Sequence, residues 1–433
     1  MAWTFETDPD FQRQLDQARE LIEQEIYPLE TLDIDYDTYL EAVRPLQARV
    51  KEMGLWAAHL PPELGGMGYG QVRLGLLNEV VGRSFLAPVA FGNNAPDSGN
   101  AELIAVATEQ TGRTDQRDKW LYPLLDGRLR SGFSMTEPGN AGSDPTLLET
   151  TAVRDGDEWV INGHKWFTTN GSISDFLIVM CVTNPDAGPY NKCSMIIVPT
   201  DTEGVHVVRD VPTMEHPHAS TGSFWGHTEI VYEDVRVPVD NLLGIEGEGF
   251  KLAQARLGPG RIHHAMRWLG QAQRAFDMLC ERAVSRYSHG SYLSEKQMVQ
   301  DFVAQSMAEI TSSRLLTLYA AWKMDMEGQS AARVEIAMIK YHGAATLYNV
   351  IDRAIQVHGG LGFSSDMPLE SMYRAARAAR IYDGADEVHK MSVARRVLRG
   401  YKPVEVPTEY IPARREAARI KFADLLDKAT MDD

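Results

Sequence analysis

The sequence predicts a mainly helical α+β fold in which a helical lobe, a β domain and a helical bundle follow one another along the chain. Apolar residues recur at helical spacing up to residue 130, short β-rich runs occupy 131–241, and long helical periods return after Gly249. Separate helical and strand-rich segments are typical of α+β proteins rather than of alternating βαβ folds. The predicted segments are 1–130, 131–245, 246–400 and a tail at 401–433.

The composition is that of an ordinary globular protein. The 433-residue chain is 44% hydrophobic and 24% charged, well away from the composition of disordered chains. A net charge of −17 argues against nucleic acid as a partner, because phosphate binding needs a cationic surface. No stretch approaches the ~20 apolar residues of a spanning helix, and Met1 to Thr7 lack the pattern of a leader. We therefore expect a cytoplasmic protein without membrane insertion.

Two amphipathic helices are expected to open the first lobe. The first begins behind Asp8 and Asp10, which can cap it, and Pro28 is expected to end it. Its apolar stripe consists of Phe11, Leu15, Ala18, Ile22 and Ile26. The second helix ends at Gly54, and its stripe consists of Leu40, Val43, Leu46, Val50 and Met53. Further helical runs lead to Trp120 and Leu124.

The β domain is expected from short apolar runs between turn residues. These runs are Phe176 to Val182, Met195 to Val198, Val205 to Val208 and Val231 to Val237. Asp155-Gly156 and Asn162-Gly163 each favour a hairpin, because Asn, Asp and Gly tolerate the positive φ of tight turns.

The bundle is expected from three long helical periods. The first stripe is Ile262, Ala265, Leu269, Ala272, Phe276, Leu279 and Ala283, and the last is Val334, Met338, Tyr341, Ala345, Tyr348, Ile351 and Ile355. Between them, a helix is expected to start near the capping-box pattern Ser294-x-x-Gln297, and its stripe is Val303, Met307, Ile310, Leu315, Leu318 and Trp322. Helices of this length can form a bundle.

Several kinds of site are excluded by pattern. The chain has no GxxxxGK[ST], HExxH or GxSxG motif, and its glycine clusters lack the strand-turn-helix context of a Rossmann site. Three unpaired cysteines imply neither a disulfide framework nor a metal site. His263 and His264 are adjacent on a helix, so their side chains point in different directions. This spacing favours core or surface histidines over a shared metal site. One of them could contact a substrate, since the segment from Gly258 is expected to open a bundle helix.

Four segments could carry chemistry, although each also has an ordinary structural explanation. Phe133 to Asp144 places small residues around a Pro-Gly turn, which permits close approach to a flat ligand. Asn162 to Asn170 offers aromatic rings for stacking, and β packing explains them equally well. Ala354 to Phe363 breaks a helix at two glycines, where amides could meet a pyrophosphate or form a C-cap. Arg380 to His389 holds an acidic residue, either a solvated loop acid or a buried base.

Together, in this order and spacing, these segments resemble the acyl-CoA dehydrogenase family, from the N-terminal helices to about Arg399. The matching motifs are Met135 to Asp144, Asn162 to Asn170, Arg286 to Gly290, Gln356 to Phe363, and Tyr382-Asp383-Gly384-Ala385. A closer similarity is to the subgroup of family members ten and eleven, which has an aspartate at the catalytic-base position. The segments that carry it are Asn94 to Asn100, Gly258 to His264 and Asp383 to His389.

The resemblance implies N-terminal helices, a central β-barrel-like domain and a C-terminal four-helix bundle, with FAD as cofactor. The residues implied near the flavin ring or its pyrophosphate are Met135, Thr136, Gly142, Ser143, Phe167 and Thr169. The residues implied to hold the ADP portion, across a subunit interface, are Arg286, Gln297, Gln356, Gly359 and Gly360. Gln297 also fits helix capping. Two positions depart from the family pattern, since Glu387 stands where a glutamine commonly touches FAD and His289 replaces an aromatic residue.

The resemblance also implies the reaction. Asp383 would remove the α-proton of an acyl-CoA, a hydride would pass to flavin N5, and the product would be a 2-enoyl-CoA of fatty acid β-oxidation. Ser143 and Gly384 would approach the thioester, and Arg261 would lie near the CoA. No metal is implied; the implied partners are an electron-transfer flavoprotein and further copies of the chain, as a homotetramer or homodimer.

The shortness of Asp383 leaves the substrate open. Aspartate has one methylene less than glutamate, about 1.5 Å of reach, and proton transfer is sensitive to displacements of roughly 1 Å. We expect either a backbone shift toward the substrate or a wider cavity for branched or substituted acyl chains. A nitroalkane oxidase with an aspartate base, and a noncatalytic helical scaffold, are the alternatives.

Overall fold

The computed structural model describes residues 7–32, 34–222 and 226–426 of the chain. The chain packs as two compact units, Met1–Lys390 and Met391–Asp433. The expectation about a leader falls almost wholly on residues outside the described ranges. Among the described helices, none combines the length and apolarity needed to cross a bilayer.

The first helix is longer than its sequence pattern suggests. Helix α1 (Pro9–Leu21) is capped by Asp8, whose side chain accepts from the Phe11 amide at 2.9 Å. It continues through a π-helical turn (Ile22–Ile26) into α2 (Tyr27–Leu29). The helical run ends at Leu29, one residue beyond the predicted Pro28. Pro28 lies directly behind the π-helical turn.

The remaining N-terminal elements form the rest of the helical lobe. They are α3 (Tyr36–Glu52), a 3₁₀ turn (Pro62–Leu64), α4 (Gln71–Val81), α5 (Ala87–Ala90), α6 (Asp97–Thr111), α7 (Thr114–Gln116), a π turn (Arg117–Leu121) and α8 (Tyr122–Leu125). The Asn94-to-Asn100 segment ties this lobe to the sheet. Asp97 Oδ1 accepts from both the Ser131 amide and hydroxyl, at 2.9 and 2.7 Å, and Asn100 donates to the same hydroxyl at 2.9 Å.

The β domain is one open eight-stranded sheet. Its strands are β1 (Ser131–Ser134), β2 (Thr151–Asp155), β3 (Glu158–Thr169), β4 (Phe176–Val182), β5 (Cys193–Pro199), β6 (Val205–Asp210), β7 (His227–Pro238) and β8 (Leu242–Leu243). They pair in the order β6-β7-β3-β2-β4-β5-β8, with β1 parallel to β4. The expected β domain is confirmed, but the sheet is not closed into a barrel, because the end strands β6 and β8 do not pair.

One of the two expected hairpins forms. Asp155 pairs with Glu158 across a turn in which Gly156 has φ +61°, as predicted. Asn162-Gly163 instead lies inside β3, opposite a bulge in which Asp234 takes the positive φ. The Asn162 side chain donates to the Asp234 carboxylate at 3.0 Å and accepts from its amide at 2.9 Å. A Cβ on Gly163 would lie 2.3 Å from Thr150 Oγ1, so this glycine permits close packing rather than a turn.

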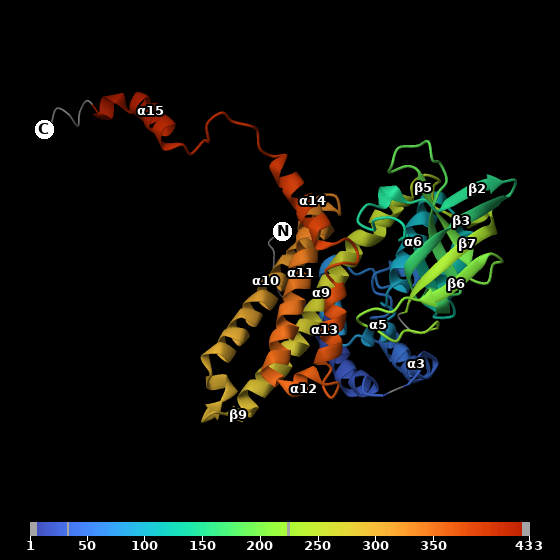
Figure 1. Cartoon of the computed structure of the whole chain (residues 1–433), viewed down its shortest axis with the longest axis horizontal. Coiled ribbons are helices and arrows are strands. Elements are labelled where there is room, and N and C mark those ends of the chain that lie inside the picture. Colours follow the sequence, from blue (N-terminus) through green and yellow to red (C-terminus); the bar gives the residue numbers. More distant parts are fainter. Residues whose placement is uncertain (1–6, 33, 223–225, 427–433) are drawn as a thin grey trace. The chain divides into compact units, whose positions relative to one another are not determined.

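The C-terminal bundle contains three long helices that pack side by side (Figure 1). They are α9 (Gly249–Ser285), α10 (Gln297–Glu327) and α11 (Arg333–His358). After α12 (Gly360–Phe363), the fourth position is filled by α13 (Leu369–Ala378), and α14 (Asp386–Leu398) follows a break. The break at residues 379–385 contains Asp383.

Helix α10 starts at Gln297, which confirms the start predicted near Ser294-x-x-Gln297. The capping residues differ, because Lys296 makes no side-chain cap and the capping box is formed by Tyr292 and Glu295 at the preceding 3₁₀ turn. The position predicted for the segment from Gly258 was wrong. The segment from Gly258 lies inside α9 rather than at its start, because α9 already begins at Gly249 and continues through Pro259.

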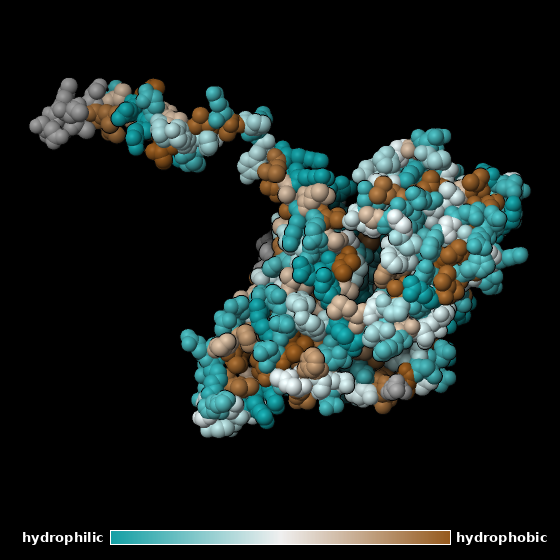
Figure 2. All heavy atoms as spheres, in the orientation of Figure 1, coloured by the Kyte–Doolittle hydropathy of each residue, from teal (hydrophilic) through white to brown (hydrophobic). Residues whose placement is uncertain are grey.

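The second unit contains α15 (Ile411–Lys421), which buries none of its side chains. Figure 2 shows apolar and hydrophilic residues intermixed on its surface. The last residues, Met431-Asp432-Asp433, lie outside the described ranges.

A buried ion pair fastens the turn after β1 to the sheet. Lys165 is fully buried and donates to Glu137 Oε1 at 2.9 Å and to the Met135 carbonyl at 2.8 Å. Glu137 also accepts from the amides of Glu149 and Thr150, both at 2.8 Å. Burial raises the pKa of Glu137, but Lys165 and these hydrogen bonds outweigh burial and lower it to about 2.

Lys165→Met should destabilise the fold by about 3 to 5 kcal/mol at neutral pH, because it leaves the Glu137 carboxylate buried without its cation. Urea unfolding measures the change. The same substitution at Lys251, whose ion pair with Glu248 is exposed, should change stability by less than about 0.5 kcal/mol.

The cost of Lys165→Met should also shrink in acid. The pKa of Glu137 lies below its ordinary value of 4.5 in the folded protein, so its contribution is present above 4.5 and is lost as the pH falls toward 2. Equal losses for the two variants, or a cost that does not change with pH, would contradict this account of the pair.

Candidate active site

Asp383 occupies the break between α13 and α14 in a constrained backbone conformation. Its φ is +54°, in the left-handed region that costs a non-glycine residue about 1 kcal/mol or more. The Asp383 carbonyl accepts from Arg261 Nε at 3.2 Å, from Arg261 Nη2 at 3.1 Å and from His389 Nε2 at 3.1 Å. These donors from α9 and α14 hold the loop in place. Strain that is held in this way is a frequent property of functional sites.

The carboxylate of Asp383 is partly accessible and contacts one histidine. Oδ2 lies 3.2 Å from His264 Nε2, and each of the two side chains is 23% exposed. Burial raises the pKa of Asp383, but the hydrogen bond with His264 and the charges of Arg256 and Arg261 outweigh it and hold the pKa below its usual range. Asp383 is therefore ionised at neutral pH and can accept a proton.

Cationic and aromatic side chains of the neighbouring helices α9 and α11 lie beside the Asp383 loop. Trp268 Nε1 donates to the Tyr382 hydroxyl at 2.9 Å. Lys340 is fully buried, donates to the Ala379 carbonyl at 2.5 Å, and lies about 5.5 Å from the centres of both rings. Burial lowers the pKa of Lys340 to about 8.

Sequence analysis named Arg261, and His264 as one of two candidates, for a substrate contact, but it did not pair either residue with Asp383. Arg261, His264 and Trp268 follow the i, i+3, i+7 spacing of one helix face, so a polar and aromatic stripe was visible on α9. Lys340 and Arg256 gave no such signal, because only the tertiary structure brings them near Asp383.

A second group of predicted residues gathers around β1 and β3. Phe167 has φ +52° and a ring that is 41% exposed, with the Trp166 and His227 rings at 4.7 and 5.8 Å. Thr169 Oγ1 lies 3.0 Å from His227 Nδ1. His227 was missed by sequence analysis, and burial lowers its pKa to about 4.

The turn after β1 lies beside this group. The Thr136 carbonyl accepts from the Trp166 amide at 3.0 Å, and Met135 is held through Lys165. Gly142 and Ser143 are exposed, and the Cβ position of Gly142 is 3.4 Å from the Thr136 methyl group. An exposed aromatic ring beside a turn of small residues can take a flat ligand.

The third predicted group is exposed and lies elsewhere. Arg286, Gln297, Gln356, Gly359 and Gly360 belong to the segments that flank β9 (Tyr287–Ser288), β10 (Ser291–Tyr292) and α12. Figure 1 shows β9 and α12 at one end of the bundle, away from the sheet. One chain therefore does not bring this group to Phe167. Gly359 forms the C-cap of α11 with φ +64°.

The two departures from the family pattern are also exposed. His289 has φ +51° in the turn between β9 and β10, where it precedes Gly290 at φ +84°. Glu387 lies in the first turn of α14, and its side chain is exposed.

Three family models cover most of the chain. The N-terminal domain of acyl-CoA dehydrogenases matches residues 8–128, the middle domain matches 132–235, and the C-terminal domain matches 247–398. The chain belongs to the acyl-CoA dehydrogenase family. This confirms both the resemblance and the expected fold. Members of this family are FAD-dependent flavoenzymes that oxidise acyl-CoA, so the chain is an oxidoreductase.

The relatives include proteins of very different length. Acyl-CoA dehydrogenase FadE2 of Mycobacterium tuberculosis is 46% identical over 378 residues, which cover 84% of this chain and 90% of that protein. Acyl-CoA dehydrogenase family member 10 of Mus musculus is 39% identical over 92% of this chain, but the match spans only 38% of that protein. Family member 11 of Gallus gallus is 41% identical over 81% of this chain and 45% of its own length.

A solved acyl-CoA dehydrogenase structure from Mycobacterium abscessus has the same architecture. It is 38% identical, with a TM-score of 0.84, and the match covers 92% of this chain and all of that one.

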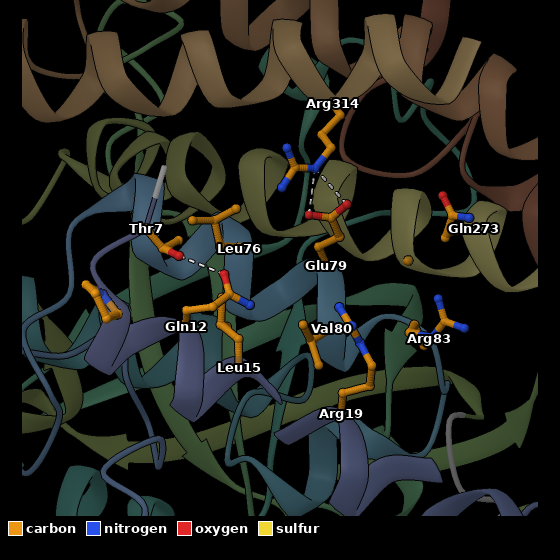
Figure 3. A pocket seen from close by; sticks show the side chains of 12 residues that line it. Thr7, Gln12, Leu15, Arg19, Leu76, Glu79, Val80, Arg83, Gln273 and Arg314 are labelled. Atoms are coloured by element: carbon orange, nitrogen blue, oxygen red, sulfur yellow. Dashed lines mark hydrogen bonds and ion pairs between the residues drawn. The ribbon is translucent and has the colours of Figure 1, made fainter. Parts of the chain in front are cut away.

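The cavity drawn in Figure 3 lies apart from the predicted site residues. It has a volume of about 560 Å³ and is lined by residues of α1, α4, α9 and α10, including Arg19, Glu79, Arg83 and Arg314. Dashed lines mark the contacts of Arg314 Nε with the two carboxylate oxygens of Glu79, both 2.9 Å, and the hydrogen bond from the Thr7 hydroxyl to Gln12 Oε1 at 2.7 Å. None of the predicted site residues lines this cavity.

Gly384→Ala should disturb the Asp383 loop more than backbone strain alone would. Gly384 has φ +96°, and an added Cβ would lie 2.8 Å from His389 Nε2. We expect a loss of about 1 to 2 kcal/mol from the positive φ and about 1 kcal/mol or more from the clash, measured by urea unfolding.

Gly112→Ala is the matched control for the loss of stability that the positive φ alone causes. Gly112 has φ +72°, and nothing lies within 4 Å of its added Cβ. This variant should lose only the strain of about 1 to 2 kcal/mol. Equal losses in the two variants would show that the contact with His389 does not matter.

Proposed function

We propose that this chain catalyses the FAD-dependent α,β-dehydrogenation of an acyl-CoA thioester to a 2-enoyl-CoA, with Asp383 as the acceptor of the α-proton. The observation that carries the proposal is the carboxylate of Asp383, which is ionised, partly accessible and fixed through its own carbonyl by Arg261 and His389. A general base needs this combination of accessibility and fixed geometry.

The residues around β1 and β3 fit the flavin. A flat ring needs an uncovered aromatic face and a closely approaching backbone, which Phe167 and the turn at Gly142 and Ser143 offer. Met135, Thr136 and Thr169 would complete this part of the site. FAD, when bound, supplies the acceptor for the β-hydride.

Asp383 would contribute a proton acceptor whose strength depends on the bound substrate. In the free protein its pKa is low, because His264 and two arginines favour the charged form. An acyl chain that excludes the remaining water would raise the pKa, since desolvation disfavours the carboxylate. Substrate binding would therefore make Asp383 a better base at the moment when it is needed.

The thioester and CoA would be held by the residues beside this loop. Gly384 and Ser143 would approach the thioester, where a backbone N–H can polarise the carbonyl and acidify the α-proton. Nε and Nη2 of Arg261 already donate to the Asp383 carbonyl. Nη1 would therefore be the atom of Arg261 that contacts CoA.

The residues that hold the ADP part of FAD would come from a second subunit. Arg286, Gln297, Gln356, Gly359 and Gly360 are exposed at the end of the bundle that lies away from the sheet (Figure 1). We therefore infer a homodimer or homotetramer in which each FAD is shared. An electron-transfer flavoprotein is the proposed acceptor, and a cytoplasmic location stays a prediction.

Asp383→Asn should keep FAD and acyl-CoA binding but lose flavin reduction by at least about 100-fold, because it removes the general base. Anaerobic mixing with a panel of acyl-CoAs that differ in length and branching measures the bleaching of the flavin. Bleaching of the parent protein by nitroalkanes but not by thioesters would instead favour a nitroalkane oxidase. Purified protein that lacks flavin absorbance after reconstitution would favour a noncatalytic scaffold.

Arg286→Ala should lower the affinity for FAD without changing the oligomeric state, because the guanidinium offers paired donors to phosphate. Equilibrium dialysis and light scattering measure these two properties. Arg154 is an exposed arginine on β2, and Arg154→Ala should leave FAD affinity unchanged. Full FAD affinity in the Arg286 variant would remove this residue from the cofactor site.

A further inference from the structure

The two oxygens of Asp383 have different surroundings. Oδ2 lies 3.2 Å from His264 Nε2. Within the described ranges, this is the one ion-pair contact of the Asp383 side chain. The carboxylate is thus anchored at one oxygen, and Oδ1 is left to accept a proton.

We propose that His264 is a positioning residue for the base, whose Nε2–H fixes Oδ2 so that Oδ1 is presented to the α-proton of the substrate. This inference rests on the proposed function of Asp383. It assigns His264 a role that the sequence motifs do not give it, because the segment Gly258 to His264 contains this residue without connecting it to the base.

A short carboxylate has a particular need for such a contact. Rotation about the last side-chain bond of aspartate is broad, so the backbone of the loop does not by itself orient the two oxygens. A displacement of about 1 Å at the reacting atoms can cost a factor of about 100 in rate. A hydrogen bond from a fixed donor restricts this rotation.

The His264 ring is itself held in place. It stacks on Trp268 with ring centres 6.1 Å apart and planes at 25°, and Tyr382 lies 5.4 Å away. Trp268 donates to the Tyr382 hydroxyl at 2.9 Å, which joins the two rings that flank the imidazole. His264 therefore presents Nε2 from a packed position on α9.

The donor is best suited to its role as a neutral imidazole. Burial lowers the pKa of His264, although Asp383 opposes this. An ionised carboxylate has no proton to give, so Nε2 must carry the hydrogen. The charged and titratable groups around the pair are Arg256, Arg261 and Arg267 on α9, Lys340 on α11, His389 on α14, and Glu102 of α6 facing two of these arginines. A neutral donor orients Asp383 without adding a further cation that would weaken the base.

The test compares His264→Leu, which removes the donor, with His264→Gln, which keeps an N–H at a similar reach. Anaerobic flavin reduction by an acyl-CoA is measured across pH in the FAD-loaded full chain. His264→Leu should slow reduction by about 10- to 100-fold. Its acid limb should move to higher pH, because loss of the hydrogen bond raises the pKa of Asp383. His264→Gln should stay nearer to the parent in both respects.

The matched control is His263→Gln on the same helix turn. The Nε2 of His263 is buried without a hydrogen-bond partner in the described structure, and this variant should reduce its flavin at the parental rate. A His264→Leu variant as fast as the parent would overturn the proposal. So would equal slowing of the three variants with an unchanged pH profile, which indicates a structural role of the helix.

Asp383→Asn distinguishes a failure of Asp383 as the base from a failure of His264 as its positioning residue. If Asp383→Asn reduces flavin normally, the base assignment itself fails. If Asp383→Asn is inactive while His264→Leu equals the parent, Asp383 remains the base and only the role of His264 is lost.

Discussion

The site depends on how the chain satisfies one partly buried carbonyl at a break between two helices. Residues 379–385 interrupt the fourth position of the bundle, and backbone groups that leave a helix must find other partners. Arg261 and His389 supply donors to the Asp383 carbonyl, while Lys340 supplies one to Ala379. The loop can therefore keep a left-handed residue at position 383 and still present its side chain.

Charge and burial act together in the same region. Asp383 is surrounded by more positive than negative groups, although the chain as a whole carries −17. A net charge says little about a site, because local clusters decide which ligand is attracted. The excess of cations suits a CoA thioester, whose phosphates are anionic, and it also explains why Asp383 is ionised before substrate binds.

The turn that would receive the flavin depends on a different buried pair. Lys165 and Glu137 link this turn to β3 and to the amides that lead into β2. A buried pair of this kind costs desolvation energy, and removing one partner leaves the other charge buried without compensation. Phe167, which is exposed, lies two residues after Lys165, at the bulge in β3.

The sequence by itself determined the order of helical and strand segments, because periodicity is a local property that reports which face of each element is buried. It also located Asp383, Phe167 and the exposed ADP-binding candidates through motifs. It did not predict the β7 bulge opposite Asn162-Gly163 or the π-helical turn in the first helix, since cross-strand contacts and the tertiary packing decided these. Only the tertiary structure gave Asp383 its partners. Arg261 lies 122 positions away in the sequence, and spacing within a helix cannot reveal which loop will pack against that helix.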